Sequence, residues 1–251
     1  MPSTLRRLAT CALAAPLALA LAACNGGDAD GTATSVSGEP IAPIAAPEGQ
    51  NWNETAVVTD MGGVQVGNPD APLKLVEYAS HTCPTCANFS NDAHSAIEEY
   101  ISTGVVSFEI RNQVHDGLDL TFAMLARCGD PSTFQPLATQ GWADLENIRN
   151  TAVANNEAFG QAMAIQDNTR FQRLGEVTGL VDWFAARGIS RDQAMQCLSD
   201  TSTAERIVQN STEQSNEFDV TGTPTFFLNG RKLDGSAWSV IEPELQKAGA
   251  R

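Results

Sequence analysis

The sequence predicts an α/β domain, and three observations lead to this prediction. An apolar run at residues 71–80 reads as a buried strand, and apolar residues at helical spacing follow it from Cys83 onward. A second short strand is expected far along the chain, at residues 225–228. The stretch between them, residues 113–218, has the apolar intervals typical of helices. Strands near both ends with helices between them indicate a mixed α/β architecture.

The chain opens with a segment that predicts export. A basic start precedes the apolar stretch 13–23, which is too short to span a bilayer, and small residues lead directly into Cys24. This pattern resembles a bacterial lipoprotein signal, so we expect residues 1–23 to be removed as a signal peptide and Cys24 to carry the lipid. The alternative is an ordinary secretory signal cut near Ala23, which leaves Cys24 as a spare thiol. Both interpretations predict an exported protein.

Residues 24–54 are expected to form the lipidated cysteine and a flexible tether. Residues 25–50 are rich in Gly, Ala, Ser, Thr and Pro and contain no aromatic residue, so they cannot bury enough surface to offset the entropy lost on ordering. A random coil of this length reaches roughly 30 Å. The folded domain is then predicted to occupy residues 55–251.

The acidic balance of the chain limits its partners. The formal net charge is −15, which argues against nucleic acid and anionic lipid surfaces as partners. The sequence shows no basic patch of the kind that nucleic-acid binding needs.

Beyond the N-terminal segment, the cysteines divide into two pairs. Cys83 and Cys86 lie three positions apart, whereas Cys128 and Cys197 are separated by a long stretch of chain. A zinc site built from all of them is disfavoured, because the second pair lacks the close spacing of zinc ligands and the histidines add no ligand spacing. We therefore expect no metal.

The surroundings of the first pair predict a redox-active dithiol. Pro84 suits the first turn of a helix, so Cys83 falls at the helix N-terminus. The free N–H groups and the helix dipole at that position should stabilise a thiolate. Cys86, one turn further in and closer to the core, is then the less exposed resolving thiol. The alternative is a purely structural disulfide between the two.

A distant stretch, VTGTPTFFLNG at residues 220–230, adds a second motif. Pro224 stands directly before the predicted strand 225–228, which suits the beginning of a strand but not a central position.

These motifs resemble those of the DsbA-type thiol:disulfide oxidoreductases, which have a thioredoxin fold. The similarity is carried by GNPDAPLKLVEYASHTCPTC, by VVSFEIRN at residues 105–112, by GTPTFFLNG and by the closing helix SAWSVIEPELQKAG. It covers essentially residues 60–250. The resemblance implies a thioredoxin fold with a helical subdomain inserted at about residues 113–218.

The resemblance also implies roles for single residues. Cys83 would be the nucleophile and Cys86 the resolving cysteine, with Pro84 and Thr85 between them. Pro224 would be the cis-proline beside the dithiol. The backbone of the preceding residue, Thr223, would pair with an extended client segment.

Four further polar residues are weighed individually. Glu77 interrupts the apolar strand at a position where the family commonly keeps a buried acid under the disulfide, and a carboxyl with a raised pKa there could exchange a proton with Cys86. The alternative is a glutamate that faces outward. We expect His81 to be a solvated loop residue rather than a group that stabilises the thiolate. His94 and His115 are assigned no role.

Cys128 and Cys197 lie in predicted helices. Similar enzymes often have a second cysteine pair in the inserted helices, so the resemblance favours a structural disulfide here over two inert buried thiols. On the chain-entropy model such a crosslink stabilises the fold by roughly 4 kcal/mol.

The expected activity is disulfide formation in thiol-containing client proteins, with no cofactor. A membrane redox partner would reoxidise the dithiol. We expect a monomer in the periplasm, lipid-anchored to the cell membrane or the outer membrane.

A disulfide isomerase or reductase maintained in the reduced state is the alternative. Thr85 stands where strong oxidants of the family have histidine, and Thr223 stands where they have valine. Isomerases of this type are usually dimers with an N-terminal dimerisation domain, for which residues 25–55 are too short and too polar. A redox-inactive binding protein on the same scaffold is a further alternative, which the intact cysteine pair disfavours.

Overall fold

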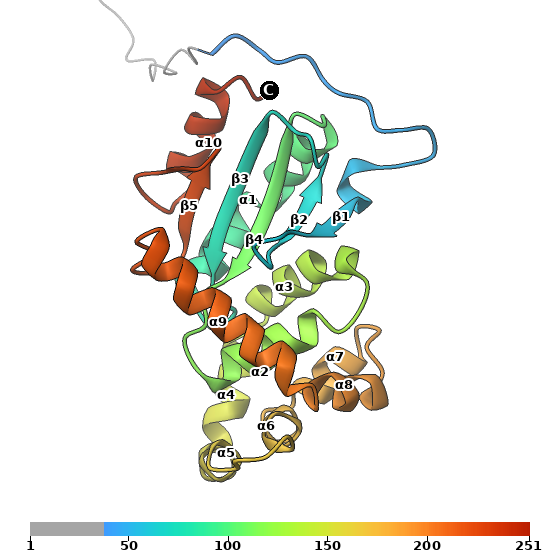
Figure 1. Ribbon diagram of the computed structural model, residues 1–251, viewed down its shortest axis with the longest axis vertical. Helices are drawn as coiled ribbons and strands as arrows, with labels where there is room; N and C mark the ends of the chain where they lie inside the picture. The colour runs from blue at the N-terminus through green and yellow to red at the C-terminus, as the bar shows by residue number, and fades with distance from the viewer. Residues whose placement is uncertain (1–37) are drawn as a thin grey trace, which may run out of the picture. The chain divides into compact units, whose positions relative to one another are not determined.

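The computed structural model describes residues 38–251. At its centre is a six-stranded sheet with the strand order β1-β2-β4-β3-β5-β6 (Figure 1). The strands are β1 (Ala56–Val58), β2 (Val64–Gly67), β3 (Leu73–Ala79), β4 (Val106–Asn112), β5 (Thr225–Leu228) and β6 (Arg231–Lys232). β3 and β4 run parallel, and the other neighbouring pairs are antiparallel.

β3 is the strand that the apolar run predicts. It pairs with β4 on one side and with β5 on the other. Six of its seven residues are buried, and Lys74 is the exposed one. A continuous apolar run is what a strand with both faces covered requires. The loop after β3 therefore begins in the interior of the domain, because β3 is a central strand of the sheet.

The helix after β3 is α1 (Pro84–Ser102), and its apolar spacing explains the face that it buries. Phe89 and Ile97 lie on the buried side of this helix. After the helix, Gly104 adopts a φ of +71°. A Cβ atom on Gly104 would lie 2.2 Å from the carbonyl oxygen of Ile44, so this close approach requires glycine.

The described part of the predicted tether is not free chain. From residue 38 onward the segment lies along the folded domain (Figure 1). The N–H of Ile44 donates to the carbonyl of Thr103 at 2.8 Å, and the buried indole of Trp52 donates to the carbonyl of Ile44 at 2.8 Å. The tether prediction is therefore wrong for residues 38–54. The prediction rested on the average composition of the segment, which does not show that a few of its apolar side chains and backbone groups make specific contacts with the folded domain.

A series of helices forms the region between β4 and β5, as predicted for residues 113–218. They are α2 (Gly117–Ala126), α3 (Phe134–Ala143), α4 (Leu145–Ala154), α5 (Asn156–Met163), α6 (Arg170–Val177), α7 (Leu180–Ala185), α8 (Arg191–Leu198) and α9 (Thr201–Glu217). Short 3₁₀ turns lie at Trp52–Glu54 and Pro131–Thr133. α2 is buried along almost its whole length. Figure 1 shows these helices beyond the C-terminal ends of β3 and β4, with α9 leading back toward β5.

The last helix, α10 (Trp238–Lys247), closes the fold beside α1. The rings of Phe89 and Trp238 pack with their centroids 6.1 Å apart. The hydroxyl of Tyr100, near the C-terminal end of α1, donates to Glu242 in the middle of α10 at 3.1 Å. These contacts hold α1, and with it the loop at its start, against the C-terminal part of the chain.

Within residues 38–251, no helix combines the length and the apolar character that crossing a membrane requires. The predicted signal peptide at residues 1–23, the proposed lipidation site Cys24 and the first part of the predicted tether lie outside the described residues.

Candidate active site

The cysteine pair lies at the junction of β3 and α1. Cys83 is the N-cap residue of α1, and Pro84 is the first helical residue. The Cys83 sulfur accepts a hydrogen bond from the backbone N–H of Cys86 at 3.4 Å. Both cysteines are free thiols in this structure. The sulfur of Cys83 therefore faces the N–H groups of the first turn, which have no partner within the helix.

The two thiols differ strongly in acidity. Hydrogen bonding from Cys86 is the main cause that lowers the pKa of Cys83 to about 5, against the opposing effect of burial. Cys86 is fully buried, and this burial raises the pKa of its thiol, with the hydrogen bond to Cys83 and the charge of Glu77 acting in the same direction. At neutral pH, Cys83 is the thiolate and Cys86 remains protonated.

The loop before β5 lies directly against Cys83, because β5 pairs with β3. The peptide bond between Thr223 and Pro224 is cis. The carbonyl oxygen of Thr223 lies 3.3 Å from the Cys83 sulfur, a position from which it can accept a hydrogen bond only from the protonated thiol. The side chain of Thr223 acts in the opposite direction and lowers the pKa of Cys83. Once Cys83 is ionised, the carbonyl is available to another donor.

Glu77 faces the interior, so the outward-facing alternative is wrong. It is only 1% exposed, and its Oε1 has no hydrogen-bond partner among the described residues. Burial raises its pKa well above the ordinary value, and the charge of Cys83 adds to this effect. The charge of Glu77 in turn raises the pKa of Cys86. A buried carboxyl that favours its protonated form thus lies close enough to influence both thiols.

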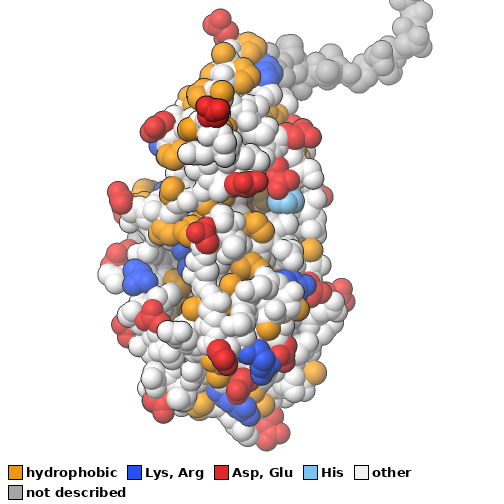
Figure 2. All heavy atoms as spheres, turned by 90° about the vertical axis from the view of Figure 1, so that its right-hand side faces the viewer, with side chains coloured by type: hydrophobic (Ala, Val, Ile, Leu, Met, Phe, Trp, Pro, Cys, Tyr) orange, Lys and Arg blue, Asp and Glu red, His pale blue; other side chains and the backbone are white. Residues whose placement is uncertain are grey.

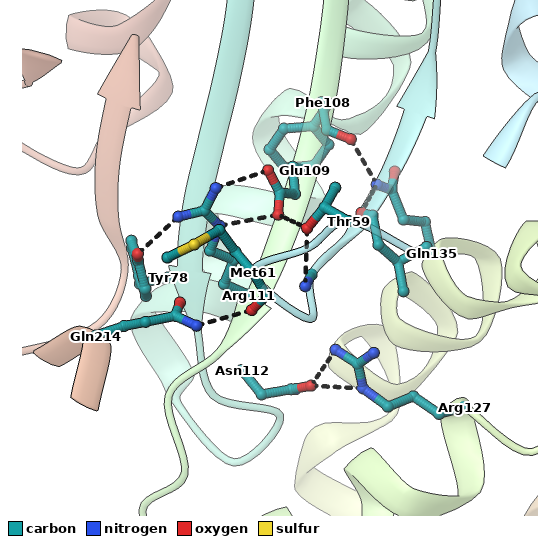
Figure 3. Close-up of polar contacts among 12 residues, drawn as sticks. Thr59, Met61, Tyr78, Phe108, Glu109, Arg111, Asn112, Arg127, Gln135 and Gln214 are labelled. Carbon is teal, nitrogen blue, oxygen red and sulfur yellow. Dashed lines mark hydrogen bonds and ion pairs between the residues drawn. The ribbon is translucent and has the colours of Figure 1, made fainter. Parts of the chain in front are cut away.

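His81 differs from the prediction of a solvated loop residue. Its side chain is buried, and its ring packs against those of Phe122 and Trp142, with centroid distances of 4.6 and 5.5 Å. Its Nε2 lies 3.0 Å from the amide nitrogen of Asn112. The oxygen of that amide accepts two hydrogen bonds from Arg127, at 2.9 and 2.7 Å, so the NH₂ group faces His81 (Figure 3).

These contacts determine the charge of His81. Because Nε2 accepts from Asn112, the ring proton belongs on Nδ1, which has no partner among the described residues. Burial lowers the pKa of His81 to about 3, and the charge of Arg127 adds to this effect. His81 is therefore neutral and supplies no positive charge to the Cys83 thiolate. Its burial is not visible in the sequence, because the surrounding rings come from the helical region.

Asp119 is a site residue that the sequence analysis missed. Its buried carboxylate accepts hydrogen bonds from the backbone N–H groups of His81 and His115, at 2.8 and 2.9 Å. Burial raises the pKa of Asp119 to about 6, although these hydrogen bonds act in the opposite direction. The ring of His115 in turn lies 3.3 Å from the hydroxyl of Thr223. The only sequence signal for Asp119 is its position in the first turn of α2, after the N-cap Asp116.

Comparison with known proteins identifies the family. A family model described as thioredoxin matches residues 59–242. A crystal structure of a protein-disulfide isomerase from Novosphingobium aromaticivorans is 31% identical, matches 72% of this chain and 94% of that chain, and superposes with a TM-score of 0.67. Wolbachia pipientis alpha-DsbA1, 22% identical with a TM-score of 0.61, covers 79% of this chain and 96% of its own, and shows the same fold. The chain belongs to the thioredoxin family.

A curated relative agrees with this assignment. A Rickettsia bellii protein with the name "Putative protein-disulfide oxidoreductase" is 24% identical over 204 residues, which are 80% of this chain and 70% of the relative. The predicted fold class, a thioredoxin fold with a helical insertion, is confirmed. The chain is an enzyme of the thiol:disulfide oxidoreductase class.

In this thioredoxin-family enzyme, an open polar cavity of about 320 Å³ lies beside Cys83. Its wall includes Pro84, His115, Arg149 and Thr223. The reactive sulfur thus borders a surface that a polypeptide can reach. Acidic side chains are spread over the face of the enzyme that Figure 2 shows, in keeping with the net charge of −15.

The second cysteine pair lies in the helical insertion of this enzyme. The structure joins Cys128 and Cys197 by a disulfide with a Cα–Cα distance of 5.8 Å. Cys128 follows α2, and Cys197 lies on α8. The crosslink therefore connects elements other than those that hold the dithiol. Among residues 38–251, no group of three or more His, Cys, Asp or Glu side chains is placed to hold a metal ion.

Proposed function

We propose that this chain is an exported protein-disulfide oxidase in which Cys83 is the nucleophile and Cys86 the resolving cysteine. The observation that carries the proposal is the division of acidity within one dithiol: the pKa of Cys83 is lowered to about 5, while burial raises that of Cys86. Only the sulfur at the helix N-terminus is then both ionised and next to a surface that a client can reach.

The reaction starts from the disulfide between the two cysteines. A client thiolate attacks the Cys83 sulfur, the Cys83–Cys86 bond breaks, and the Cys86 sulfur leaves as a thiolate that takes up a proton. Glu77 is the proposed donor of this proton, because it is buried beside the pair and favours its protonated form. A second client thiolate then attacks the client sulfur of the mixed disulfide. Cys83 leaves as a thiolate, and two electrons have moved from the client to the enzyme.

The backbone next to Pro224 is proposed to position the client during this exchange. The carbonyl of Thr223 lies 3.3 Å from the Cys83 sulfur and can accept a hydrogen bond from a client N–H when Cys83 is ionised or disulfide-bonded. Pro224 has no N–H that competes for acceptors at this position.

Oxidation is favoured over isomerisation by the acidity of Cys83. A stabilised thiolate stabilises the reduced enzyme, and this makes the disulfide form a stronger oxidant. Isomerisation is the second candidate, because the Novosphingobium aromaticivorans relative is described as a protein-disulfide isomerase and because Thr223 stands before Pro224. We expect a reduction potential between about −270 mV and about −120 mV. A value at or below the lower figure would favour a reductase.

Trapping experiments test the roles of the two cysteines. In Cys86→Ala, Cys83 can still form mixed disulfides, but no neighbouring thiol resolves them. Reducible complexes with client proteins should therefore accumulate on non-reducing gels. Cys83→Ala should show few or none. Trapping by Cys83→Ala but not by Cys86→Ala would reverse the assignment.

The proposal includes attachment to a membrane through a lipid on Cys24, with a membrane redox partner that reoxidises the dithiol and thiol-containing proteins of the periplasm as clients. Cys24→Ser should release the protein from the membrane fraction and remove the lipid mass from its N-terminal peptide.

A monomer is supported by residues 38–54, which lie along their own domain. Gel filtration tests the monomer.

A further inference from the structure

A second polar cavity lies between the β1–β2 turn, β4, the end of α2, and α9. Its volume is about 200 Å³, below the roughly 300–1,000 Å³ of cavities that take drug-sized ligands. Arg111, Arg127 and Arg206 line it, and the described residues of its wall include no Asp or Glu. The whole chain has 15 Lys and Arg against 30 Asp and Glu. The lining of this cavity, with its three arginines and no acidic residue, is therefore basic although the chain as a whole is acidic.

Arg111 is the one arginine of the three whose charge is neutralised. Its Nε and Nη2 donate to the two carboxylate oxygens of Glu109, at 2.8 and 3.0 Å, and its Nη1 donates to the hydroxyl of Tyr78 at 2.9 Å (Figure 3). The hydroxyl of Thr59 also donates to Glu109, at 2.6 Å. Glu109 therefore accepts its hydrogen bonds from Arg111 and Thr59, and it acts on Arg127 only through its charge, which partly offsets the lowering of the Arg127 pKa.

Arg127 and Arg206 carry charges without a carboxylate partner. Neither forms an ion pair within residues 38–251. Arg127 donates twice to the amide oxygen of Asn112, which is neutral. Burial lowers the pKa of Arg127 to about 10, and the charge of Arg206 adds to this effect. The two guanidinium groups repel each other at the same cavity. An anion that bound both would offset this repulsion and accept charge-assisted hydrogen bonds.

The remaining wall brings a neutral donor to the same cavity. Arg206 and Asn210 are four residues apart, and therefore share one face of α9. A Cβ atom on Gly62 would lie 2.3 Å from the amide nitrogen of Asn210, so glycine allows the β1–β2 turn to approach the helix. The amide of Gln214 donates to the carbonyl of Met61 at 2.7 Å and fastens this turn to α9 (Figure 3).

We propose that this cavity binds a small phosphate-type oxoanion, held by Arg127 and Arg206 with Asn210 as a neutral donor. The site is separate from the dithiol but connected to it. Asn112, which Arg127 holds, donates to His81, two positions before Cys83. The oxoanion is therefore linked to the active-site loop through a short chain of hydrogen bonds.

Binding can be measured by thermal unfolding of the oxidised enzyme in sodium phosphate and in sodium chloride of equal ionic strength, and by calorimetric titration with inorganic phosphate. Phosphate should raise the melting temperature in a saturable manner. Arg206→Gln should weaken phosphate binding roughly tenfold or more, since charge-assisted hydrogen bonds are lost. The control is Arg173→Gln, which removes the same charge from a residue already paired with Glu176 at 3.1 Å. It should leave phosphate binding unchanged.

Asn210→Asp provides an independent test, because it places a carboxylate where the anion should bind. This variant should melt at a higher temperature than the wild type in chloride and should lose the response to phosphate. Asn216→Asp, at an exposed position of the same helix, should retain the response.

Sedimentation with phosphatidylglycerol vesicles distinguishes the two sources of the ligand. If the wild-type enzyme co-sediments with the vesicles and Arg206→Gln does not, the ligand is a lipid phosphate. If the wild-type enzyme does not co-sediment but responds to inorganic phosphate, the ligand is the free ion. A response to free phosphate or to the vesicles supports the proposal only if Arg206→Gln removes it and Arg173→Gln retains it. If neither ligand gives such a response, the proposal fails.

Discussion

Asp119 accepts a hydrogen bond from the backbone N–H of His81 at 2.8 Å, and this contact joins the helical insertion to the loop that leads into Cys83. The second carboxylate oxygen of Asp119 accepts from the N–H of His115 at 2.9 Å. One buried side chain therefore holds two backbone segments that flank the reactive sulfur. An Asp in the first turn of a helix is usually a surface residue, whereas this one organises the active site.

We expect Asp119→Asn to destabilise the enzyme at neutral pH by about 1–3 kcal/mol, because an amide has one acceptor atom and one of the two N–H groups would face its NH₂ group. Asp116→Asn is the matched control. Asp116 caps α2, and Asn caps helices about as well as Asp. Urea unfolding measures both. Equal effects of the two substitutions would contradict the role of Asp119.

The acidity of Cys83 predicts how the reduced enzyme responds to pH. Its pKa falls from 9.0 to about 5 on folding, so the thiolate stabilises the reduced folded state fully above about pH 9 and progressively less as the pH falls toward 5. Alkylation of reduced enzyme should follow a single titration with a midpoint near pH 5, and Cys86→Ala should raise this midpoint, because the hydrogen bond from the Cys86 side chain is the largest cause of the lowered pKa. A midpoint near the ordinary thiol value would show that the helix N-terminus does not stabilise the sulfur.

Glu77→Gln should change the pH dependence of the oxidised enzyme, which has no free thiols. The folded-state pKa of Glu77 is raised, so the folded state binds its proton more tightly, and stability falls as the pH rises above about 4.5. The variant lacks this loss, which is at most about 1.4 kcal/mol per pH unit. The difference in unfolding free energy between variant and wild type should therefore grow with pH. The variant should also form mixed disulfides more slowly, because Cys86 leaves without a nearby proton donor.

Replacing Cys128 and Cys197 together by alanine should lower the unfolding free energy by roughly 4 kcal/mol on the chain-entropy model, because the closed loop is long. Exchange activity should change little, since this crosslink lies on α8 and at the end of α2. Thermal unfolding and a dithiol-exchange assay measure the two effects. Loss of exchange at full stability would show that this pair, and not Cys83 with Cys86, is the redox site.

The position of Cys83 could be predicted from the sequence, because it depends only on the strand and the helix formed by neighbouring residues. The run 71–80 predicts β3 and the helical intervals predict α1, so Cys83 had to lie at a helix N-terminus. A proline before a strand is equally local, and the strand at residues 225–228 has the predicted bounds.

The surroundings of the site could not be predicted in this way, because they depend on contacts between distant segments. His81 resembles a loop histidine until Phe122 and Trp142 from the helical insertion enclose it. The role of Asp119 likewise depends on loops that only the folded chain brings together. Residues 38–54 mislead for the same reason, since their partners, such as Thr103, lie far along the chain.

The docked segment that begins at residue 38 also determines where the described chain enters the domain relative to the dithiol. The carbonyl of Gly38 accepts a hydrogen bond from Arg251 at 2.6 Å, and the segment then reaches the end of α1 at Thr103. Cys83 lies at the opposite end of that helix. The chain therefore enters the domain at the pole remote from the reactive sulfur.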